Sequence, residues 1–280
     1  MLVFLLSPFI INCYEETQCY EETQAYTTVY LSGAAYCGKD NYNSMHLAGP
    51  AFNFVYQETL YDTKTDLQGY IGYIPLKKSI YVVIRGSSSI LNWIDDFEVK
   101  LVNYETWPIC NCKVHYGFYR SAEAVRNKTI NTVLLLKHKF PDYSVIMTGH
   151  SYGAATVQLL GMELEHCGIN VEIYNYGQPR IGDKNYAEFV NNVIKSYWRF
   201  THDKDIVPHL PPISGLGYMH SCREVFEDID GNMKICSNTN CEDILCSGQY
   251  SVSQTNREDH SYYLGHYLDC DTSTINYNGP

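Results

Sequence analysis

The stretch Gly149-His150-Ser151-Tyr152-Gly153 has the form G-x-S-x-G, and the interpretation of the whole chain starts from it. Residues 142–148 before it contain an apolar Val-Ile-Met run that predicts a buried strand, and residues 154–164 after it predict a helix. Between a strand and a helix, this pattern indicates a nucleophile elbow, a sharp turn that holds its serine in a strained conformation. The two glycines suit this turn because residues two positions from the serine must be small. Ser151 is therefore the candidate nucleophile.

Length and composition predict one large α/β domain. The chain has 280 residues, 45% of them hydrophobic, and no Pro/Gly/Ser-rich tract or block of charge divides it into two halves. The formal net charge is -11. This charge argues against nucleic acid and strongly anionic membranes as partners, because phosphate groups require basic surfaces. Neutral lipid surfaces and small neutral esters remain compatible with it.

The cysteine count indicates an oxidising compartment. Of the eleven cysteines, four crowd the C-terminal part without any C-x-x-C spacing, namely Cys236, Cys241, Cys246 and Cys270. A disulfide framework explains this usage better than a metal site does. Asn127-Lys128-Thr129 is an N-glycosylation sequon, which can be used only if the chain is secreted.

The first residues have the hydropathy of a secretory signal. Met1 to Ile11 are apolar apart from Ser7, and the run is too short to span a bilayer. However, the first basic residue is Lys39, so a basic n-region is missing, and Pro8 interrupts the run. We expect a signal peptide over residues 1–13 and a single domain over 14–280. The alternative is a buried N-terminal segment.

The order of predicted elements defines the fold class. Strands are expected at 52–56, 67–74, 80–84, 171–176 and 197–202, and helices at 119–139 and 184–196. Strand and helix alternate from residue 80 to 202, which predicts right-handed βαβ units and a largely parallel central sheet. A further helix, Thr23 to Cys37, is expected to pack near the end of the chain.

A short amphipathic helix is predicted after the strand at 80–84. Ile90, Trp93, Ile94 and Phe97 fall at i, i+3, i+4 and i+7, so they share one helix face. Periodicity alone favours an ordinary helix that faces the core. The alternative is a mobile lid that turns this apolar face toward a lipid surface.

A serine nucleophile needs a general base, and the base needs an orienting carboxylate. In chains with a nucleophile elbow the order is serine, then aspartate or glutamate, then histidine. Asp203 and Asp205 both follow the strand that ends at His202, and spacing does not choose between them. The candidate bases beyond them are His209, His220, His260 and His266.

Several segments in the same order resemble the class 3 lipases, a family typified by small secreted lipases of filamentous fungi. The similarity extends from about Thr23 to Cys270 and rests on these matches: Ala35-Tyr36-Cys37, Arg85 to Ile90 with Asn92-Trp93-Ile94, Val114-His115 with Gly117-Phe118, Thr148 to Ser151, Tyr176 to Arg180 with Gly182-Asp183, Asp205 to Pro212, and Asp259-His260 with Tyr263. The resemblance implies an α/β-hydrolase fold, with a mostly parallel central sheet flanked by helices and a short helical lid.

The resemblance also implies the roles of the site residues. Ser151 becomes the nucleophile, Asp205 the orienting acid and His260 the base. The oxyanion hole is formed by the backbone N–H of Tyr152 together with the N–H and hydroxyl of Ser87.

The resemblance further identifies residues 88–97 as the lid, with Trp93 on its apolar face. It pairs Cys37 with Cys270, which joins the two ends of the chain, and Cys236 with Cys246. No counterpart in the family can be assigned to five other cysteines, namely Cys110, Cys112, Cys167, Cys222 and Cys241.

Two positions depart from the family pattern. Tyr152 stands where an aliphatic residue is usual, so its ring is expected to narrow or polarise the acyl pocket. Ala154 stands where a second glycine is common, and its methyl group slightly weakens the elbow prediction.

These observations predict a secreted serine hydrolase that cleaves acylglycerols at a lipid–water interface, without a metal or cofactor. An esterase for soluble or feruloyl-type esters and a phospholipase are the alternative enzymes, although the acidic net charge disfavours anionic phospholipid. A non-catalytic lipid-binding or interaction protein is the alternative of another class. It is disfavoured because all three triad residues are present with both oxyanion positions.

Overall fold

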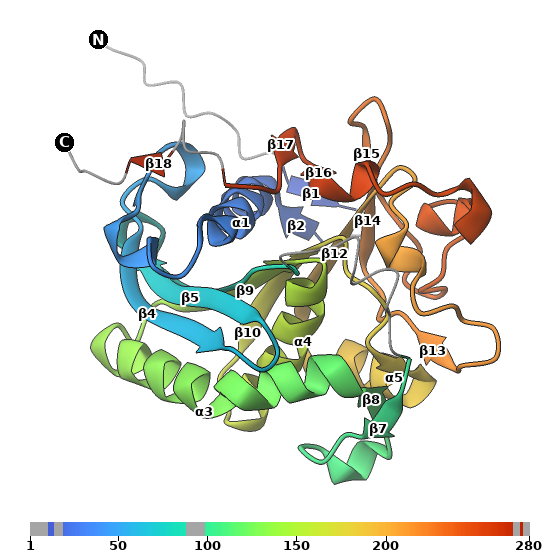
Figure 1. Ribbon diagram of the computed structural model, residues 1–280, viewed down its shortest axis with the longest axis horizontal. Coiled ribbons are helices and arrows are strands. Elements are labelled where there is room, and N and C mark those ends of the chain that lie inside the picture. The colour runs from blue at the N-terminus through green and yellow to red at the C-terminus, as the bar shows by residue number, and fades with distance from the viewer. Residues whose placement is uncertain (1–10, 14–18, 88–98, 271–274, 277–280) are drawn as a thin grey trace.

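The computed structural model describes residues 11–13, 19–87, 99–270 and 275–276 (Figure 1). The expected lid face, Ile90, Trp93, Ile94 and Phe97, lies outside these residues, as does most of the expected signal peptide. Nothing in the described part therefore tests either expectation. In that part, no helix combines the length and the hydropathy required to cross a membrane.

An eight-stranded sheet forms the centre of the protein, in the order β15-β14-β12-β10-β9-β6-β5-β4. Its strands are β4 Val55–Asp62, β5 Leu67–Ile74, β6 Ser79–Ile84, β9 Ser144–His150, β10 Val171–Tyr176, β12 Ser196–His202, β14 Glu224–Glu227 and β15 Met233–Ile235. The run from β6 to β14 is parallel, whereas β4, β5 and β15 are antiparallel. The expected α/β-hydrolase fold with a mostly parallel sheet is confirmed.

The sequence placed one strand imprecisely and missed two others. The first predicted strand, 52–56, is shifted, since β4 runs over Val55–Asp62. Strands β14 and β15 were not expected, because acidic residues at both ends of β14 conceal its buried character. In the structure Glu224 is buried beside the guanidinium of Arg199, at 3.1 Å, so its charge is compensated inside the protein.

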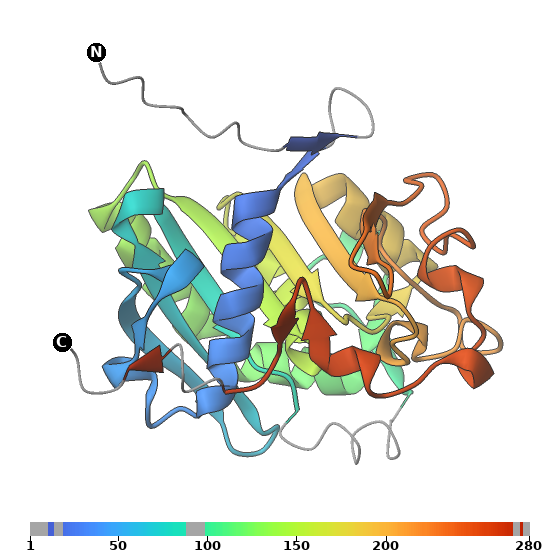
Figure 2. The same ribbon diagram turned by 90° about the horizontal axis from the view of Figure 1, so that it is seen from above.

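Helices cover both faces of the sheet (Figure 1). Helix α1 (Glu22–Ala34) lies on one face and crosses it (Figure 2), while α3 (Tyr116–Lys139), α4 (Tyr152–His166) and α5 (Lys184–Val193) lie on the other. The apolar core accordingly has two main clusters, one on each side of the sheet, and a small third cluster surrounds Phe226. Burial of each sheet face by helices is what allows near-continuous apolar strands such as β6, which is buried along its whole length.

Smaller sheets and short helices complete the chain. A second sheet pairs β7 (Leu101–Asn103), β8 (Lys113–His115), β11 (Gly182–Asp183) and β13 (Tyr218–Met219). Two-stranded pairs are formed by β1 (Ile11–Cys13) with β2 (Cys19–Glu21), β3 (His46–Leu47) with β18 (Ile275–Asn276), and β16 (Tyr262–Tyr263) with β17 (His266–Tyr267). Single turns of 3-10 helix occur at Ala35–Cys37, Tyr42–Ser44, Gly49–Ala51, Pro75–Lys77, Pro108–Cys110, Val207–His209, Ser247–Gln249, Val252–Gln254 and Asp259–Ser261.

Four disulfides cross-link the described chain, and one of them ties its C-terminal part to the region after α1. Cys37, after α1, is bonded to Cys270, so helix α1 lies beside the end of the described chain. Cys236 is bonded to Cys246. Cysteines for which the sequence suggested no partner form two more bonds, Cys110–Cys112 and Cys222–Cys241. Cys167 is an exposed free thiol.

Candidate active site

The serine turn between β9 and α4 is built by close backbone packing. Ser151 has φ 57° and ψ -127°, a strained conformation for a residue with a side chain. A Cβ on Gly149 would lie 2.6 Å from the carbonyl carbon of Gly153, and a Cβ on Gly153 would lie 2.3 Å from the Ile84 carbonyl oxygen. Neither position can accept a side chain without a shift of backbone. These contacts are the physical reason for the G-x-S-x-G spacing.

Asp205, rather than Asp203, is paired with His260. The Nδ1 atom of His260 lies 2.8 Å from Oδ2 of Asp205, and both side chains are buried. The hydroxyl of Tyr263 also donates to Oδ2, and the Val207 N–H donates to Oδ1 at 2.8 Å. Asp203 instead accepts a hydrogen bond from the Tyr250 hydroxyl at 2.9 Å. The tertiary structure therefore makes a choice that spacing left open.

The carboxyl group of Asp205 is held in its ionised form. Burial by itself raises its pKa, but the nearby His260, the Tyr263 hydroxyl and the Val207 N–H together lower the pKa below its ordinary value. An ionised carboxylate at Nδ1 requires that the imidazole carry its proton there. The remaining nitrogen, Nε2, is then free to accept a proton from a nucleophile.

The ends of β9, β10 and β12 bring the serine and the His260–Asp205 pair to one edge of the sheet. The Ser151 N–H donates to the Tyr176 carbonyl at 2.9 Å, and Gly177 follows directly. A Cβ on Gly177 would lie 2.8 Å from Cε1 of His260 and 3.0 Å from Oδ2 of Asp205. The serine and the pair thus meet around the end of β10, which is where α/β sheets commonly place their sites.

Two buried polar atoms at this edge have no hydrogen-bond partner among the described residues, namely Oγ of Ser151 and Nε2 of His260. Buried polar atoms are normally satisfied, so unpaired ones require an explanation. A hydroxyl and an imidazole nitrogen are the donor and acceptor that a serine nucleophile and its base must provide. In unliganded enzymes this hydrogen bond is often long and tightens only when substrate binds.

The loop that carries His260 is fixed by two histidines that the sequence did not identify as site residues. The imidazole Nε2 of His150 donates to the backbone carbonyl of His260 at 2.8 Å, and Nδ1 of His202 donates to that of Asp259 at 3.0 Å. The Tyr36 hydroxyl donates to Nδ1 of His150 at 2.6 Å. Burial, reinforced by His260, lowers the pKa of His150 well below its ordinary value, so this ring stays neutral and keeps both bonds.

The other candidate histidines serve elsewhere. His220 donates from Nε2 to the Pro208 carbonyl at 2.7 Å, and the backbone carbonyl of His209 accepts from Arg180. His266 lies in the two-stranded pair β16–β17. Only the family resemblance distinguished these histidines from His260, because burial and hydrogen bonding are tertiary properties.

The two expected oxyanion donors belong to segments next to the serine. Tyr152 is the first residue of α4, where backbone N–H groups point out of the helix. Ser87 follows β6, and its neighbour Gly86 lies so close to the serine that a Cβ there would be 3.1 Å from the Ser151 Cβ. Segment 85–87 therefore lies beside the nucleophile.

The Tyr152 side chain packs against the start of α3. Its hydroxyl is hydrogen-bonded to the Ser121 hydroxyl, and its ring meets Phe118 edge-to-face with the centroids 5.4 Å apart. Burial raises the pKa of Tyr152 to about 12, so the hydroxyl is neutral. Nothing in the described residues tests the expected narrowing of an acyl pocket, which stays a prediction.

One group of potential metal ligands occurs in the described part of the chain, formed by Cys236, Asp243 and Cys246. The two cysteines are joined as a disulfide, so their sulfur atoms are not available as thiolate ligands.

A strained serine at a strand–helix turn, with an Asp-oriented histidine at the same sheet edge, is the arrangement that serine hydrolases of the α/β-hydrolase fold use. Comparison with known proteins agrees. Residues 81–215 match the family model "Lipase (class 3)". A solved triacylglycerol lipase whose catalytic centre is formed by a serine protease triad superposes with TM-score 0.81 and 30% identity, over 93% of this chain and 99% of that one.

The Rhizomucor miehei triacylglyceride lipase structure gives TM-score 0.80 and 32% identity, over 93% of this chain and 98% of that chain. The chain belongs to the class 3 lipase family. Curated relatives include a Rhizomucor miehei lipase, 37% identical over 68% of this chain, and a Fusarium solani secreted mono- and diacylglycerol lipase, 31% identical over 66% of it. The chain spans only 53% and 57% of the lengths of these two relatives.

Proposed function

We propose that this protein hydrolyses carboxylic esters through Ser151, His260 and Asp205. The observation that carries the proposal is the buried His260–Asp205 pair, whose atoms Nδ1 and Oδ2 are 2.8 Å apart, at the same sheet edge as a strained serine. The hydroxyl of this serine has no hydrogen-bond partner among the described residues. His260 Nε2 takes the hydroxyl proton as Ser151 Oγ attacks the acyl carbonyl. Asp205 holds the imidazole tautomer and stabilises the imidazolium that forms.

The same groups then catalyse the formation and the hydrolysis of the acyl-enzyme. The imidazolium of His260 returns its proton to the leaving alcohol, which departs and leaves the acyl group on Ser151. Water enters and loses a proton to His260 Nε2 as its oxygen attacks the acyl carbonyl, and His260 then returns that proton to Ser151 Oγ as the acyl–oxygen bond breaks and the carboxylic acid leaves. The N–H of Tyr152 and the N–H and hydroxyl of Ser87 stabilise the negative charge on each tetrahedral oxyanion. Loss of one such donor typically reduces kcat about 10²–10³-fold.

Acylglycerols at a lipid–water interface are the proposed substrates. Two observations support this class: the relatives are triacylglycerol and mono- and diacylglycerol lipases, and one neighbour of 30% identity is a fungal lipase–inhibitor complex that served as a model for interfacial activation. The spacing of Ile90, Trp93, Ile94 and Phe97 gives the amphipathic character that the lid implied by the family resemblance requires.

Secretion is the proposed route to this substrate. The disulfides favour an oxidising compartment, relatives such as the Fusarium solani enzyme are secreted, and Asn127 is exposed on α3 where a glycan could be carried. Residues 1–13 provide the expected signal peptide. Expression in a eukaryotic secretory host should yield protein in the medium whose mass falls on deglycosylation, whereas Asn127→Gln should show no such shift.

The test of function is the hydrolysis rate of short- and long-chain esters measured through their solubility limits, with Ser151→Ala as the blank. A rate that jumps when an emulsion forms, and that vanishes in the variant, supports an interfacial lipase. A smooth saturating curve on dissolved esters indicates an esterase instead. Absence of turnover on every ester would refute the proposal and favour the non-catalytic binding protein.

A further inference from the structure

The backbone segment after Asp205 is held by one buried arginine. Arg180, which follows β10, is 6% exposed. Its Nη1 donates to the carbonyls of His209 at 2.7 Å and Pro211 at 2.9 Å, and its backbone N–H donates to that of Leu210 at 2.8 Å. Three successive carbonyls therefore depend on a single residue. The segment they belong to begins with Val207, whose N–H binds the Asp205 carboxylate.

The opposite edge of the guanidinium binds a carboxylate. Nε and Nη2 of Arg180 donate to the two oxygens of Glu242 at 2.8 and 2.7 Å, a bidentate pair of the strong, geometrically specific kind. Glu242 also accepts from the His220 N–H at 2.9 Å, and the His220 ring donates to the Pro208 carbonyl at 2.7 Å. All four carbonyls from residue 208 to 211 are thus bound by residues that Glu242 holds.

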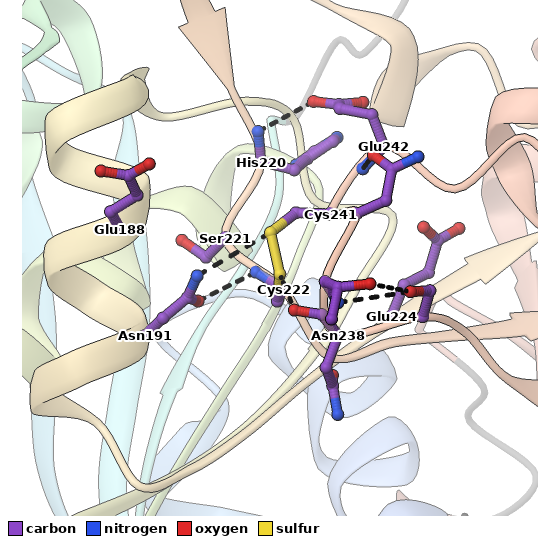
Figure 3. The surroundings of a disulfide bond; sticks show 12 residues. Glu188, Asn191, His220, Ser221, Cys222, Glu224, Asn238, Cys241 and Glu242 are labelled. Atoms are coloured by element: carbon purple, nitrogen blue, oxygen red, sulfur yellow. Dashed lines mark hydrogen bonds between the residues drawn. A yellow bond between two sulfur atoms is a disulfide. The ribbon is translucent and has the colours of Figure 1, made fainter.

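The position of Glu242 is set by a disulfide for which the family resemblance suggested no counterpart. Cys241 directly precedes Glu242 and is bonded to Cys222, two residues after His220 (Figure 3). Asn191 of α5 accepts from the Cys222 N–H at 2.9 Å and donates to Sγ of Cys241 at 3.8 Å, so it anchors the bond to a helix. His220, which binds the Pro208 carbonyl, and Glu242, which binds Arg180, therefore both lie next to one cross-link.

We propose that Arg180 is a positioning residue for the catalytic acid, and that the Cys222–Cys241 bond keeps its partner Glu242 in place. The inference rests on the proposed function, in which Asp205 orients His260. Segment 207–211 has only a single turn of 3-10 helix, so side-chain bonds rather than a regular ladder decide where it lies. Displacement of catalytic groups by about 1 Å can reduce the rate about 10²-fold.

The experiment measures kcat and KM on a dissolved short-chain ester for wild type, Ser151→Ala, Arg180→Met, Glu242→Gln and the double variant Cys222→Ser/Cys241→Ser. Arg180→Met keeps the apolar stem and removes every side-chain donor, so kcat should fall about 10- to 100-fold with KM changed less than about threefold. Glu242→Gln and the double-serine variant should each lower kcat by about three- to tenfold, because part of the network remains.

The matched control is Glu224→Gln. Glu224 is more deeply buried than Glu242 and pairs with Arg199 at 3.1 Å, but Arg199 donates to the Cys241 carbonyl at 3.4 Å and, among the described residues, to no carbonyl of residues 207–211. Glu224→Gln should lower the unfolding temperature while kcat of the folded protein stays within about twofold of wild type. If Glu242→Gln and Arg180→Met behave in the same way, Arg180 is structural only and the inference is wrong.

Amide hydrogen exchange separates this inference from the proposed function. Faster exchange at the Val207 and Leu210 amides in Glu242→Gln, but not in Glu224→Gln, supports positioning of the segment whether or not the protein turns over ester. If the wild type turns over ester but Glu242→Gln leaves exchange at these two amides as it is in the wild type, the inference alone is overturned. Silence of wild type on all esters would overturn the proposed function while the exchange data still decide the role of Arg180.

Discussion

The two halves of the candidate site are held in place by different means. Ser151 lies between a strand and a helix, and its geometry is imposed by backbone atoms that pack within 2.6 Å of where side chains at 149 and 153 would begin. Asp205 and His260 lie in irregular segments after β12, and their geometry is imposed by buried side chains such as His150, Tyr263 and Arg180. A regular element constrains its neighbours locally, whereas an irregular segment requires partners from distant parts of the chain.

The largest effect should come from the acid itself. Asp205→Asn should reduce kcat by about 10³–10⁴, because an amide permits the wrong imidazole tautomer and leaves the imidazolium uncompensated. Asp203→Asn is the matched control, since Asp203 lies two residues away and binds Tyr250 instead. Its kcat on a dissolved ester should be close to wild type. Equal losses in the two variants would contradict the assignment of Asp205.

The next effect concerns the disulfide that ties the chain after α1 to the segment after His260. Cys37–Cys270 closes 233 residues, and its replacement by two serines should lower the free energy of unfolding by about 5.5 kcal/mol in the loop-entropy model. Cys110–Cys112 closes only two and should contribute less than about 2 kcal/mol. Denaturant unfolding of both double variants checks the difference, and a reversed order would show that chain entropy does not govern these bonds here.

A change in the serine turn should have an intermediate effect. Gly153→Ala places a methyl group 2.3 Å from the Ile84 carbonyl oxygen, which only a backbone shift can relieve, so we expect a loss of about 3 kcal/mol in unfolding free energy. Gly161→Ala in the same helix meets the flexible end of the Ile173 side chain and should be nearly neutral. Similar thermal unfolding of the two variants would mean that the turn tolerates side chains.

The smallest effect tests the side-chain network by pH. Burial, together with the nearby charges of Arg199 and Arg180, lowers the pKa of His220 well below its ordinary value of 6.5. The unfolded chain therefore binds a proton below pH 6.5 that the native protein does not, and stability falls as pH decreases, by up to about 1.4 kcal/mol per pH unit. In His220→Gln the slope of unfolding free energy against pH should be shallower, because the unfolded chain then takes up one proton fewer. An unchanged slope between pH 6.5 and 5 would show that His220 titrates normally in the fold.

Much of the first half of the site could be predicted from sequence. The G-x-S-x-G spacing between a strand and a helix located Ser151, and alternation of elements indicated the parallel sheet, because both are local patterns. The pairing of His260 with Asp205 followed only from family resemblance; spacing left Asp203 and three other histidines in contention. Strand β14 was missed because its glutamates are compensated by a distant arginine.

The sequence by itself determined the fold class, the nucleophile turn and the presence of enough cysteines for a cross-linked protein, since periodicity, glycine spacing and composition act over neighbouring residues. Only the tertiary structure decided which aspartate faces which histidine, that His150 and His202 hold the base's loop, and that Cys222–Cys241 places Glu242 against Arg180. Burial, charge compensation and hydrogen-bond partners depend on segments far apart in the chain, so no local pattern records them.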